Sequence, residues 1–179
     1  MTALSAQTRA KLDRIAEHEG ALGSTLMNRV LRAVGPSRAF TFVYSRLGPI
    51  LDRPLLRHAG KKVGRFYGFP ALLLATTGAK TGKRRESPLL YVRDGDAFVV
   101  VGTNWGGERH PAWTGNLMKN PNAQIETAGE QLDVTAELAD EATWQRLWPK
   151  MGAMYAGYDK YLERLKHRTP RMFLLHPHD

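Results

Sequence analysis

The most chemically suggestive part of the sequence is a short stretch that concentrates positive charge, TTGAKTGKRRESP at positions 76–88. Between two apolar runs typical of strands it carries four basic residues: Lys80, Lys83, Arg84 and Arg85. Gly78 and Gly82 let the backbone turn and approach a ligand closely, and an arginine can hold a phosphate through two parallel hydrogen bonds. The stretch predicts a loop that binds phosphate or carboxylate groups, although a bare basic turn is more often simply solvated.

The same stretch does not match the phosphate-binding P-loop, in which GxxxxGK is followed by Ser or Thr. Its two glycines, Gly78 and Gly82, are separated by three residues instead of four. Arg84 follows Lys83 at the place of the magnesium-binding hydroxyl, and a strand rather than a helix is expected next. The sequence therefore predicts a strand–loop–strand element and not a nucleotide site of the P-loop type.

A second candidate region, VGTNWGGERHPAWTGN at 101–116, runs from the end of a strand through a Gly-Gly pair to the start of a helix. Helix N-termini expose free N–H groups and a positive dipole end, so they accept anions. Trp105 and Trp113 could stack on a flat ring, although core packing is the commoner fate of a tryptophan. Asn116 could contact the polar edges of such a ring.

A third candidate region, MYAGYDKY, places three tyrosines three residues apart: Tyr155, Tyr158 and Tyr161. This step puts them roughly on one side of a helix. Three phenols on one stripe can line a slot for a flat aromatic substrate or donate protons. The competing interpretation is an amphipathic helix with tyrosines at the rim of the core.

Composition and missing motifs exclude several classes of protein. The 179 residues suffice for one ordinary domain, and 42% hydrophobic with 24% charged residues is typical of globular chains. No apolar run approaches the ~20 residues of a membrane-spanning helix, and no secretory signal is seen. Cysteine is absent, which fits a cytoplasmic location. No HExxH or GxSxG pattern occurs, so neither a metal site nor Ser-His-Asp catalysis is predicted.

The net charge of +9 is unevenly distributed. Residues 1–70 contain 12 Lys and Arg against 4 Asp and Glu, whereas residues 71–179 contain 14 against 13. A basic N-terminal segment can bind nucleic acid or an anionic membrane surface. A solvated helical face is an equally good explanation, and no known nucleic-acid-binding motif is present.

The pattern of apolar residues changes near residue 70, from helical to strand-like. Helices are predicted for 5–19, 24–35 and 36–60, followed later by 110–120, 141–148 and 154–168. A buried strand is expected at 71–77, hairpins at 86–103 and 123–138, and a last strand at 171–176. About six short, mostly antiparallel strands with inserted helices predict a mainly β (α+β) fold, either a small barrel or a sheet with covering helices.

The three candidate regions, in this order, resemble the deazaflavin (F420)-dependent nitroreductase family, a branch of the split β-barrel flavin and deazaflavin oxidoreductases best known from actinobacteria. The resemblance covers residues 60–177. It implies a split β-barrel domain related to FMN-binding folds at 60–179, preceded by an N-terminal helical extension at 1–59. It also implies coenzyme F420, whose phospholactyl-polyglutamate tail is the polyanion that a basic loop would hold.

The resemblance also implies roles for individual residues. Catalytic roles would fall to Tyr155, Tyr158 and Thr103, and substrate contacts to Tyr155, Tyr161 and Trp105. Cofactor contacts would come from Ala79, Lys80, Thr81, Arg85, Glu86, Ser87, Pro88, Leu89, Leu90, Val101, Gly102, Thr103, Asn104, Ala112, Trp113, Thr114, Gly115, Asn116 and Tyr158. Trp105 is bulkier than the small residue usual in the family, and Thr103 stands where Ser is common.

The implied activity is transfer of a hydride from reduced F420 to a quinone, an activated enone or a nitroaromatic compound. A split-barrel protein that uses FMN, or one that carries a flavin or other ligand without turnover, is the alternative. A quinone dissolved in a membrane would give the basic N-terminal helices a purpose, namely association with the cytoplasmic face of that membrane. A homodimer is a further option, because split barrels often dimerise.

Overall fold

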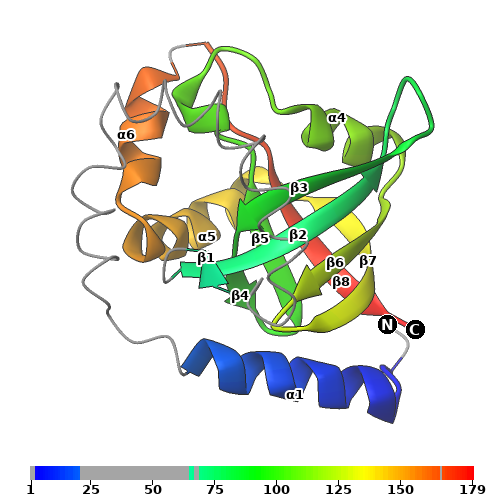
Figure 1. The fold of residues 1–179 in the computed structure, drawn as a ribbon. Coiled ribbons are helices and arrows are strands. Elements are labelled where there is room, and N and C mark those ends of the chain that lie inside the picture. Colours follow the sequence, from blue (N-terminus) through cyan, green and yellow to red (C-terminus); the bar gives the residue numbers. More distant parts are fainter. Residues whose placement is uncertain (1–2, 21–64, 67–68, 166) are drawn as a thin grey trace.

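The computed structural model describes residues 3–20, 65–66, 69–165 and 167–179 (Figure 1). The helices predicted for 24–35 and 36–60 lie outside these described residues, as does most of the predicted extension 1–59. The helix predicted for 5–19 is confirmed, since α1 spans Ala6–Gly20.

The other described elements follow in chain order, with antiparallel pairing between all neighbouring strands. They are β1 Arg65–Phe66, β2 Phe69–Thr77, β3 Arg84–Leu90, β4 Val92–Asp94, β5 Ala97–Val101, the 3₁₀ turn η2 Asn104–Gly106, α4 Ala112–Lys119, β6 Asn122–Thr127, β7 Glu130–Leu138, α5 Glu141–Met154, α6 Gly157–Arg164 and β8 Met172–His178.

The strands close into a barrel because one extended run, residues 84–94, serves two pairs. Its first part, β3, pairs with β2, and its last part, β4, pairs with β5. From β2 the order continues through β6, β7, β8 and β5 to β4, which leads back along the chain to β3. The predicted split barrel is therefore confirmed. The prediction of about six strands missed the two-residue β1, which is too short to show periodicity, and the division between β3 and β4.

Tyr91 is the seam between the two halves of this run. Its N–H donates to the Pro70 carbonyl on β2 at 3.2 Å. Its ring is buried edge-on against Phe98, with the centroids 5.2 Å apart, and its hydroxyl donates to a carboxylate oxygen of Glu19 on α1 at 2.6 Å. The point at which run 84–94 changes its pairing partner is thus fixed by contacts of Tyr91 with β2, with the barrel interior and with α1.

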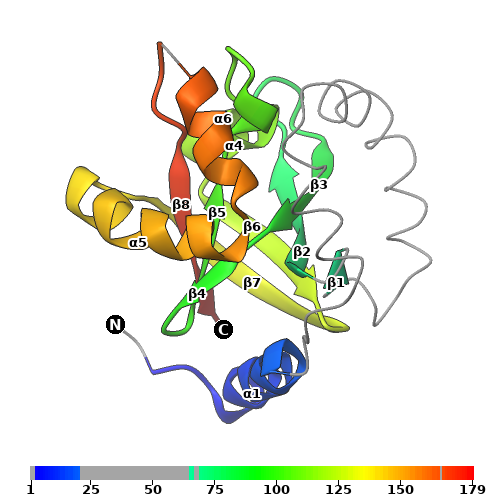
Figure 2. The ribbon, with the colours of Figure 1, turned by 90° about the vertical axis from the view of Figure 1, so that its left-hand side faces the viewer.

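The core has two parts, separated by strands β5 and β8. Because side chains alternate along a strand, Phe98 and Val100 of β5 point into the barrel, where α1 and α4 also contribute apolar residues. Val99 and Val101 point outward and pack beneath α5 and α6. All five residues of β5 are buried. Figure 2 shows α5 and α6 on the outer side of these strands and α1 across one end of the barrel.

Helix α1 is fastened at the end of the barrel where the chain terminates. Leu12 and Ile15, three residues apart on one face, are buried in the barrel core. The side-chain carboxylate of the last residue, Asp179, accepts hydrogen bonds of 2.6 Å from the hydroxyls of Ser5 and Thr8. A carboxylate at a helix N-terminus is stabilising, so the two ends of the chain hold each other.

The two predicted hairpins form at the predicted turns. Gly95, with φ +61°, follows Asp94 in the β4–β5 turn. Ala128 and Gly129, with φ +53° and +81°, form the β6–β7 turn. Positive φ at both central residues of the β6–β7 turn, and at the first central residue of the β4–β5 turn, matches the twist of a tight hairpin.

The helical region after β7 differs from the prediction. Asp140 caps α5 as expected, accepting a hydrogen bond from the Thr143 N–H at 2.8 Å. Pro149 lies inside α5, which nevertheless continues to Met154. The helix predicted for 154–168 is wrong in its start and end, because Tyr155 is extended, with φ −143° and ψ 102°, and α6 occupies only Gly157–Arg164.

Two findings concern what the described residues lack. None of their helices is both long and apolar enough to cross a membrane. Among the same residues, no three His, Asp or Glu side chains come together in a way that could hold a metal ion.

An ion-pair cluster joins α5 to the β4–β5 hairpin. Both terminal nitrogens of Arg146 donate to the Asp94 carboxylate, at 2.8 and 2.7 Å, and Lys150 adds a contact of 3.1 Å. The hydrogen bonds from Arg146, and then those from Lys150, hold the pKa of the Asp94 carboxyl well below its ordinary value. The Asp94 side chain is only 19% exposed, so the pair is partly shielded from water.

We predict that Asp94→Asn lowers the free energy of unfolding at pH 7 by about 1 kcal/mol, because a charged hydrogen-bonded pair is lost. A lowered folded pKa adds stability above the unfolded pKa, about 3.9 for Asp, and that stability disappears as the pH falls through the folded value. Urea unfolding at pH 7 and pH 2.5 measures both terms, and the difference between variant and wild type should shrink at the lower pH.

Asp96→Asn is the matched control, since Asp96 pairs with Arg9 at 2.8 Å but both side chains are about half exposed (48% and 52%). Its effect should stay within about 0.5 kcal/mol. An equal loss for Asp94→Asn at both pH values would contradict the ion-pair explanation.

Candidate functional site

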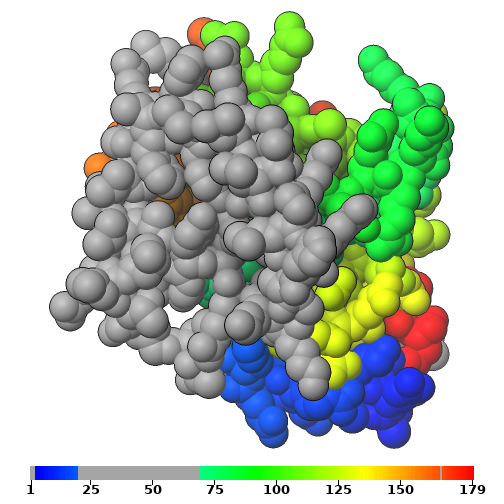
Figure 3. Space-filling view, in the orientation of Figure 1, coloured from blue at the N-terminus to red at the C-terminus, as the bar shows by residue number. Residues whose placement is uncertain are grey.

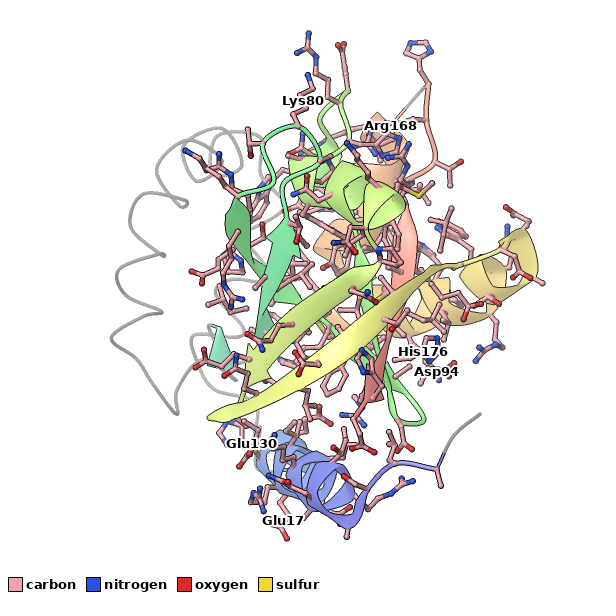
Figure 4. All side chains as sticks on the ribbon, turned by 90° about the vertical axis from the view of Figure 1, so that its right-hand side faces the viewer. Glu17, Lys80, Asp94, Glu130, Arg168 and His176 are labelled. Carbon is pink, nitrogen blue, oxygen red and sulfur yellow. The ribbon has the colours of Figure 1, made fainter. Side chains whose placement is uncertain are left out.

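The second candidate region contacts both of the others, since Asn116 bonds Ala79 of the basic loop and the Trp105 ring packs on Tyr161. The basic loop and α4 lie at the end of the barrel opposite α1. Figure 4 shows Lys80 and Arg168 at this end, with α4 close by, and Glu17 and Glu130 at the other. In Figure 1 the β2–β3 connection, α4 and α6 follow one another across this end. The space-filling view shows a notch in the surface between the β2–β3 connection and the segment that leads into α4 (Figure 3).

The basic loop, residues 78–85, has a tight internal structure. The Gly78 N–H donates to the Lys83 carbonyl at 2.9 Å, and the Gly82 N–H donates to the Gly78 carbonyl at 2.8 Å. Gly82 has φ +66°, a conformation open to glycine at little cost. The bend is therefore preformed, as the two glycines predict.

Asn116 on α4 anchors this loop to the body of the protein. Its side-chain oxygen accepts from the Ala79 N–H at 2.9 Å, and its amide nitrogen donates to the Thr76 hydroxyl at 2.9 Å. Lys119, one turn later, donates to the Ala79 carbonyl at 2.7 Å. Both ends of the Asn116 amide are thus engaged within the protein, and its predicted contact with a ring system stays a prediction.

Most of the positive charge in the loop has no carboxylate partner in the described part of the chain. Arg84 is the exception, because it pairs with Glu86 at 3.3 Å and donates to Gln124. Lys80, Lys83 and Arg85 are exposed, and no ion pair of theirs occurs among the described residues. Three cations on a preformed bend suit a ligand with several negative charges.

The segment after β5 makes an unusual turn. Asn104, Trp105 and Gly106 all have positive φ, at 50°, 57° and 78°. For a residue with a side chain this conformation costs about 1–3 kcal/mol and persists only where the surroundings enforce it. The Gly107 N–H donates to the Asn104 carbonyl at 2.8 Å, and the Asn104 amide donates to the Arg109 carbonyl at 2.9 Å. We call residues 103–107 the strained turn.

Arg168 holds the strained turn from beneath, and sequence reasoning did not single it out. Its guanidinium donates to the carbonyls of Thr103 at 2.8 Å, Gly107 at 2.7 and 3.2 Å, and Gly102 at 3.3 Å. It also contacts Nδ1 of His110 at 3.2 Å. Nothing in the sequence marks this role, because Arg168 follows α6 in an irregular segment 58–66 residues from its partners.

The three tyrosines form a buried cluster beside the strained turn. The ring centroids of Tyr155, Tyr158 and Tyr161 lie 5.6–6.3 Å apart, and the hydroxyls of Tyr155 and Tyr161 are 3.2 Å apart. The Trp105 ring meets Tyr161 edge-on at 5.9 Å. The predicted grouping is thus confirmed, although Tyr155 precedes α6 instead of lying on it. Burial raises the pKa of Tyr155 and Tyr158, so both phenols stay protonated near neutral pH.

The first turn of α4 faces the same end of the barrel. No side chain caps it, because the N-cap residue is Pro111, which has no polar side-chain atom. The Thr114 hydroxyl donates to the Pro111 carbonyl at 2.8 Å. Ala112 is exposed and Gly115 is half-buried with open space above it. Trp113, by contrast, is buried in the barrel core against Phe173. The Trp113 ring therefore packs in the core and is not placed to stack on a flat ring, and a ligand could meet only the Trp113 backbone.

The remaining predicted contacts lie on strands. Half-buried positions on β3 are Glu86, Ser87, Pro88, Leu89 and Leu90. Buried positions at the end of β5 are Val101, Gly102 and Thr103. Within the described chain the Thr103 hydroxyl has no hydrogen-bond partner, while its carbonyl is held by Arg168. A fixed backbone with a free hydroxyl is what a binding or catalytic role requires.

Comparisons with known proteins agree on one family. A family model described as F420H(2)-dependent quinone reductase matches residues 52–174. The F420H(2)-dependent quinone reductase Rv1261c of Mycobacterium tuberculosis is 37% identical over 108 residues, which cover 59% of this chain and 72% of that protein.

Solved structures agree with the fold. A structure of an F420-H2 dependent reductase (FDR-A) is similar with a TM-score of 0.54 at 29% identity, covering 59% of this chain and 93% of that one. A structure described as a domain-swapped dimer reaches 0.56 at 27% identity, covering 72% and 96%. The family expected from the three regions is thus confirmed.

We predict that Asn116→Ala loosens the basic loop, because the Ala79 N–H loses its acceptor and the buried Thr76 hydroxyl keeps only its 3.4 Å hydrogen bond to the Arg85 carbonyl. Losing these two hydrogen bonds should lower the free energy of unfolding by about 2 kcal/mol. Hydrogen–deuterium exchange should be faster for peptides covering residues 78–83. Asn122→Ala, which removes an exposed asparagine at the start of β6, is the control and should leave that exchange unchanged. Unchanged exchange in Asn116→Ala would show that the loop does not depend on this anchor.

Proposed function

The chain belongs to the F420H(2)-dependent quinone reductase family, and from this premise we propose that it transfers a hydride from reduced coenzyme F420 to a quinone. The observation that carries the proposal is the group of three cations on the preformed basic loop, Lys80, Lys83 and Arg85, which pair with no carboxylate among the described residues. F420 combines a flat redox ring with a tail of several negative charges, and both features have a counterpart at one end of this barrel. The proposed deazaflavin-binding domain is the barrel, residues 60–179.

The residues present fit the coenzyme. Lys80 and Arg85 offer charge-assisted hydrogen bonds to the phosphate and carboxylates of the tail, and exposed Thr81 adds a hydroxyl. The uncapped first turn of α4 offers N–H groups and a positive dipole end. The Ala79 N–H is already bonded to Asn116, so in this proposal Ala79 contributes shape rather than a donor. Half-buried β3 residues such as Ser87 and Leu90 would run along the ring.

Reduced F420 supplies the hydride, and the protein supplies binding, orientation and electrostatics. Thr103 and Tyr158 have hydroxyls without a partner among the described residues, so both can donate a hydrogen bond to negative charge that develops on an acceptor oxygen. Because burial raises the pKa of Tyr158, its phenol acts as a hydrogen-bond donor and not as a base. Tyr155, Tyr161 and Trp105 would form the wall against which a flat acceptor lies.

The quinone is the acceptor class that we favour, and activated enones and nitroaromatics share its flat, electrophilic character. We extend the proposal to them as secondary acceptors. We also propose a cytoplasmic enzyme that meets its quinone at the membrane surface, since the sequence before residue 71 is strongly basic. A homodimer is part of the same proposal.

We predict that Lys80→Ala and Arg85→Ala each weaken binding of F420 about tenfold, since each removes one charge-assisted contact worth about 1.5 kcal/mol. Fluorescence titration measures this affinity. A deazaflavin that lacks the phosphate tail should bind wild type and both variants equally.

Lys11→Ala is the matched control. Lys11 carries the same charge on α1, at the opposite end of the barrel, where it bonds the Gln131 carbonyl at 2.9 Å. It should bind F420 as wild type does. If wild type binds FMN more tightly than F420, or oxidises no reduced F420 in the presence of menadione, the proposed function is wrong.

We predict that Tyr158→Phe lowers kcat with menadione about 100-fold, the usual effect of losing one donor to a developing oxyanion. The raised pKa keeps this phenol protonated between pH 6 and 9, so wild-type kcat should not decline there through its ionisation. Tyr91→Phe, at the seam, is the control and should leave kcat unchanged. An alkaline decline below pH 9 that Tyr158→Phe abolishes would contradict the assignment.

A further inference from the structure

We infer that Arg168 is a positioning residue, which holds the strained turn in the one shape that fixes the Thr103 hydroxyl and the Trp105 ring beside the acceptor. The inference rests on the proposed function, because it concerns the same site. It adds a residue that lies outside all three candidate regions of the sequence.

One planar group reaches both ends of the turn. At its start Arg168 donates to the carbonyls of Gly102 and Thr103, and at its end Arg168 donates twice to the carbonyl of Gly107. Three successive residues with positive φ lie between these points. A conformation of that kind needs surroundings that over-determine it, and the guanidinium supplies that constraint.

Arg168 has no donor left for a ligand. A guanidinium carries five N–H donors, and Nε, Nη1 and Nη2 of Arg168 together make five contacts. The free cations of the basic loop are the opposite case. Arg168 therefore acts on the site through the backbone of the turn and not as part of the anion-binding surface.

His110 also depends on Arg168. For Nδ1 of His110 to meet an Arg168 N–H at 3.2 Å, that nitrogen must be an acceptor, so the ring is neutral with its proton on Nε2. Burial, and then the nearby charge of Arg168, lower the pKa of His110, which favours the same neutral form. The pKa of His110 therefore responds to the presence of Arg168.

The strained turn also contacts the other parts of the candidate site. The Trp105 ring packs on Tyr161, and a β-carbon at Gly106 would lie 3.1–3.3 Å from Arg164 and the Tyr161 carbonyl, which is tighter than an ordinary contact. A shift of the turn would therefore move the Thr103 hydroxyl and disturb the tyrosine cluster together. Misplacement by about 1 Å can cost 100-fold in rate, without any change in how the anionic tail is held.

The test compares Arg168→Gln and Arg168→Lys with Arg93→Gln. Arg93 is a matched control, since its guanidinium also donates twice to one carbonyl, that of Gly95, but at the β4–β5 turn, on the side of the barrel where Asp96 contacts α1. We expect both Arg168 variants to lose about 100-fold in kcat with menadione, while the dissociation constant of F420 changes less than threefold. Lysine should not rescue activity, because its donors radiate from a single nitrogen. Arg93→Gln should keep the wild-type kcat.

Added guanidinium ion, at concentrations that leave the fold intact, should restore part of the kcat of Arg168→Ala and none of any loss in Arg93→Gln. A fall in kcat no larger than that of Arg93→Gln would overturn the inference. So would a parallel loss of F420 affinity, since that would reflect general damage to the site.

A readout independent of activity separates this inference from the proposed function. Amide exchange in peptides covering residues 102–110 should accelerate at least tenfold in Arg168→Gln and not in Arg93→Gln. The pKa of His110, followed by nitrogen NMR, should rise in Arg168→Gln, because the Arg168 charge that lowers it is removed. If wild type fails to use F420 but these changes occur, the function is wrong and the role of Arg168 in the turn stands. If the exchange and the pKa of His110 are unchanged, the role of Arg168 is wrong whatever the activity.

Discussion

One geometric constraint supports the rest of the molecule: the extended run 84–94 must pair with β2 at its start and with β5 at its end. This double pairing closes the barrel. It also links the two sides of the candidate site, because the run begins in the basic loop and ends at Asp94, whose ion pairs hold α5. The tyrosine cluster follows directly from α5. The cationic and aromatic parts of the site are therefore positioned by opposite ends of one piece of backbone.

Features encoded by neighbouring residues were predictable from the sequence. The hairpin turns at Gly95 and at Ala128-Gly129, the Asp140 cap and the α4 helix all form where local signals place them. Features that depend on distant contacts were not. The seam at Tyr91 needs Pro70 and Glu19, and the extended Tyr155 between α5 and α6 needs the packing of three rings.

The candidate site likewise combines features that neighbouring residues encode with features that depend on distant contacts. The basic loop and the three tyrosines could be identified by residue type and spacing, because several similar side chains stand close in the sequence. Arg168 is a single arginine among many, and its importance comes from carbonyl groups about sixty residues away. Asn116 was expected to contact a ligand, and that contact stays a prediction, but both ends of its amide also bond within the protein. Residue type suggested a polar role for it, and only the fold could show that the partner is the loop itself.

The close approach of Gly157 to Tyr155 has an evolutionary consequence. A β-carbon at position 157 would overlap the Tyr155 ring and its hydroxyl, so the aromatic ring at position 155 requires a glycine at position 157. Among relatives, the two positions should covary: lineages that replace the tyrosine with a smaller residue are free to lose the glycine, and those that keep the ring are not. A lineage that changes its acceptor preference by replacing Tyr155 would then also accept a replacement of Gly157, which has no effect on the acceptor itself.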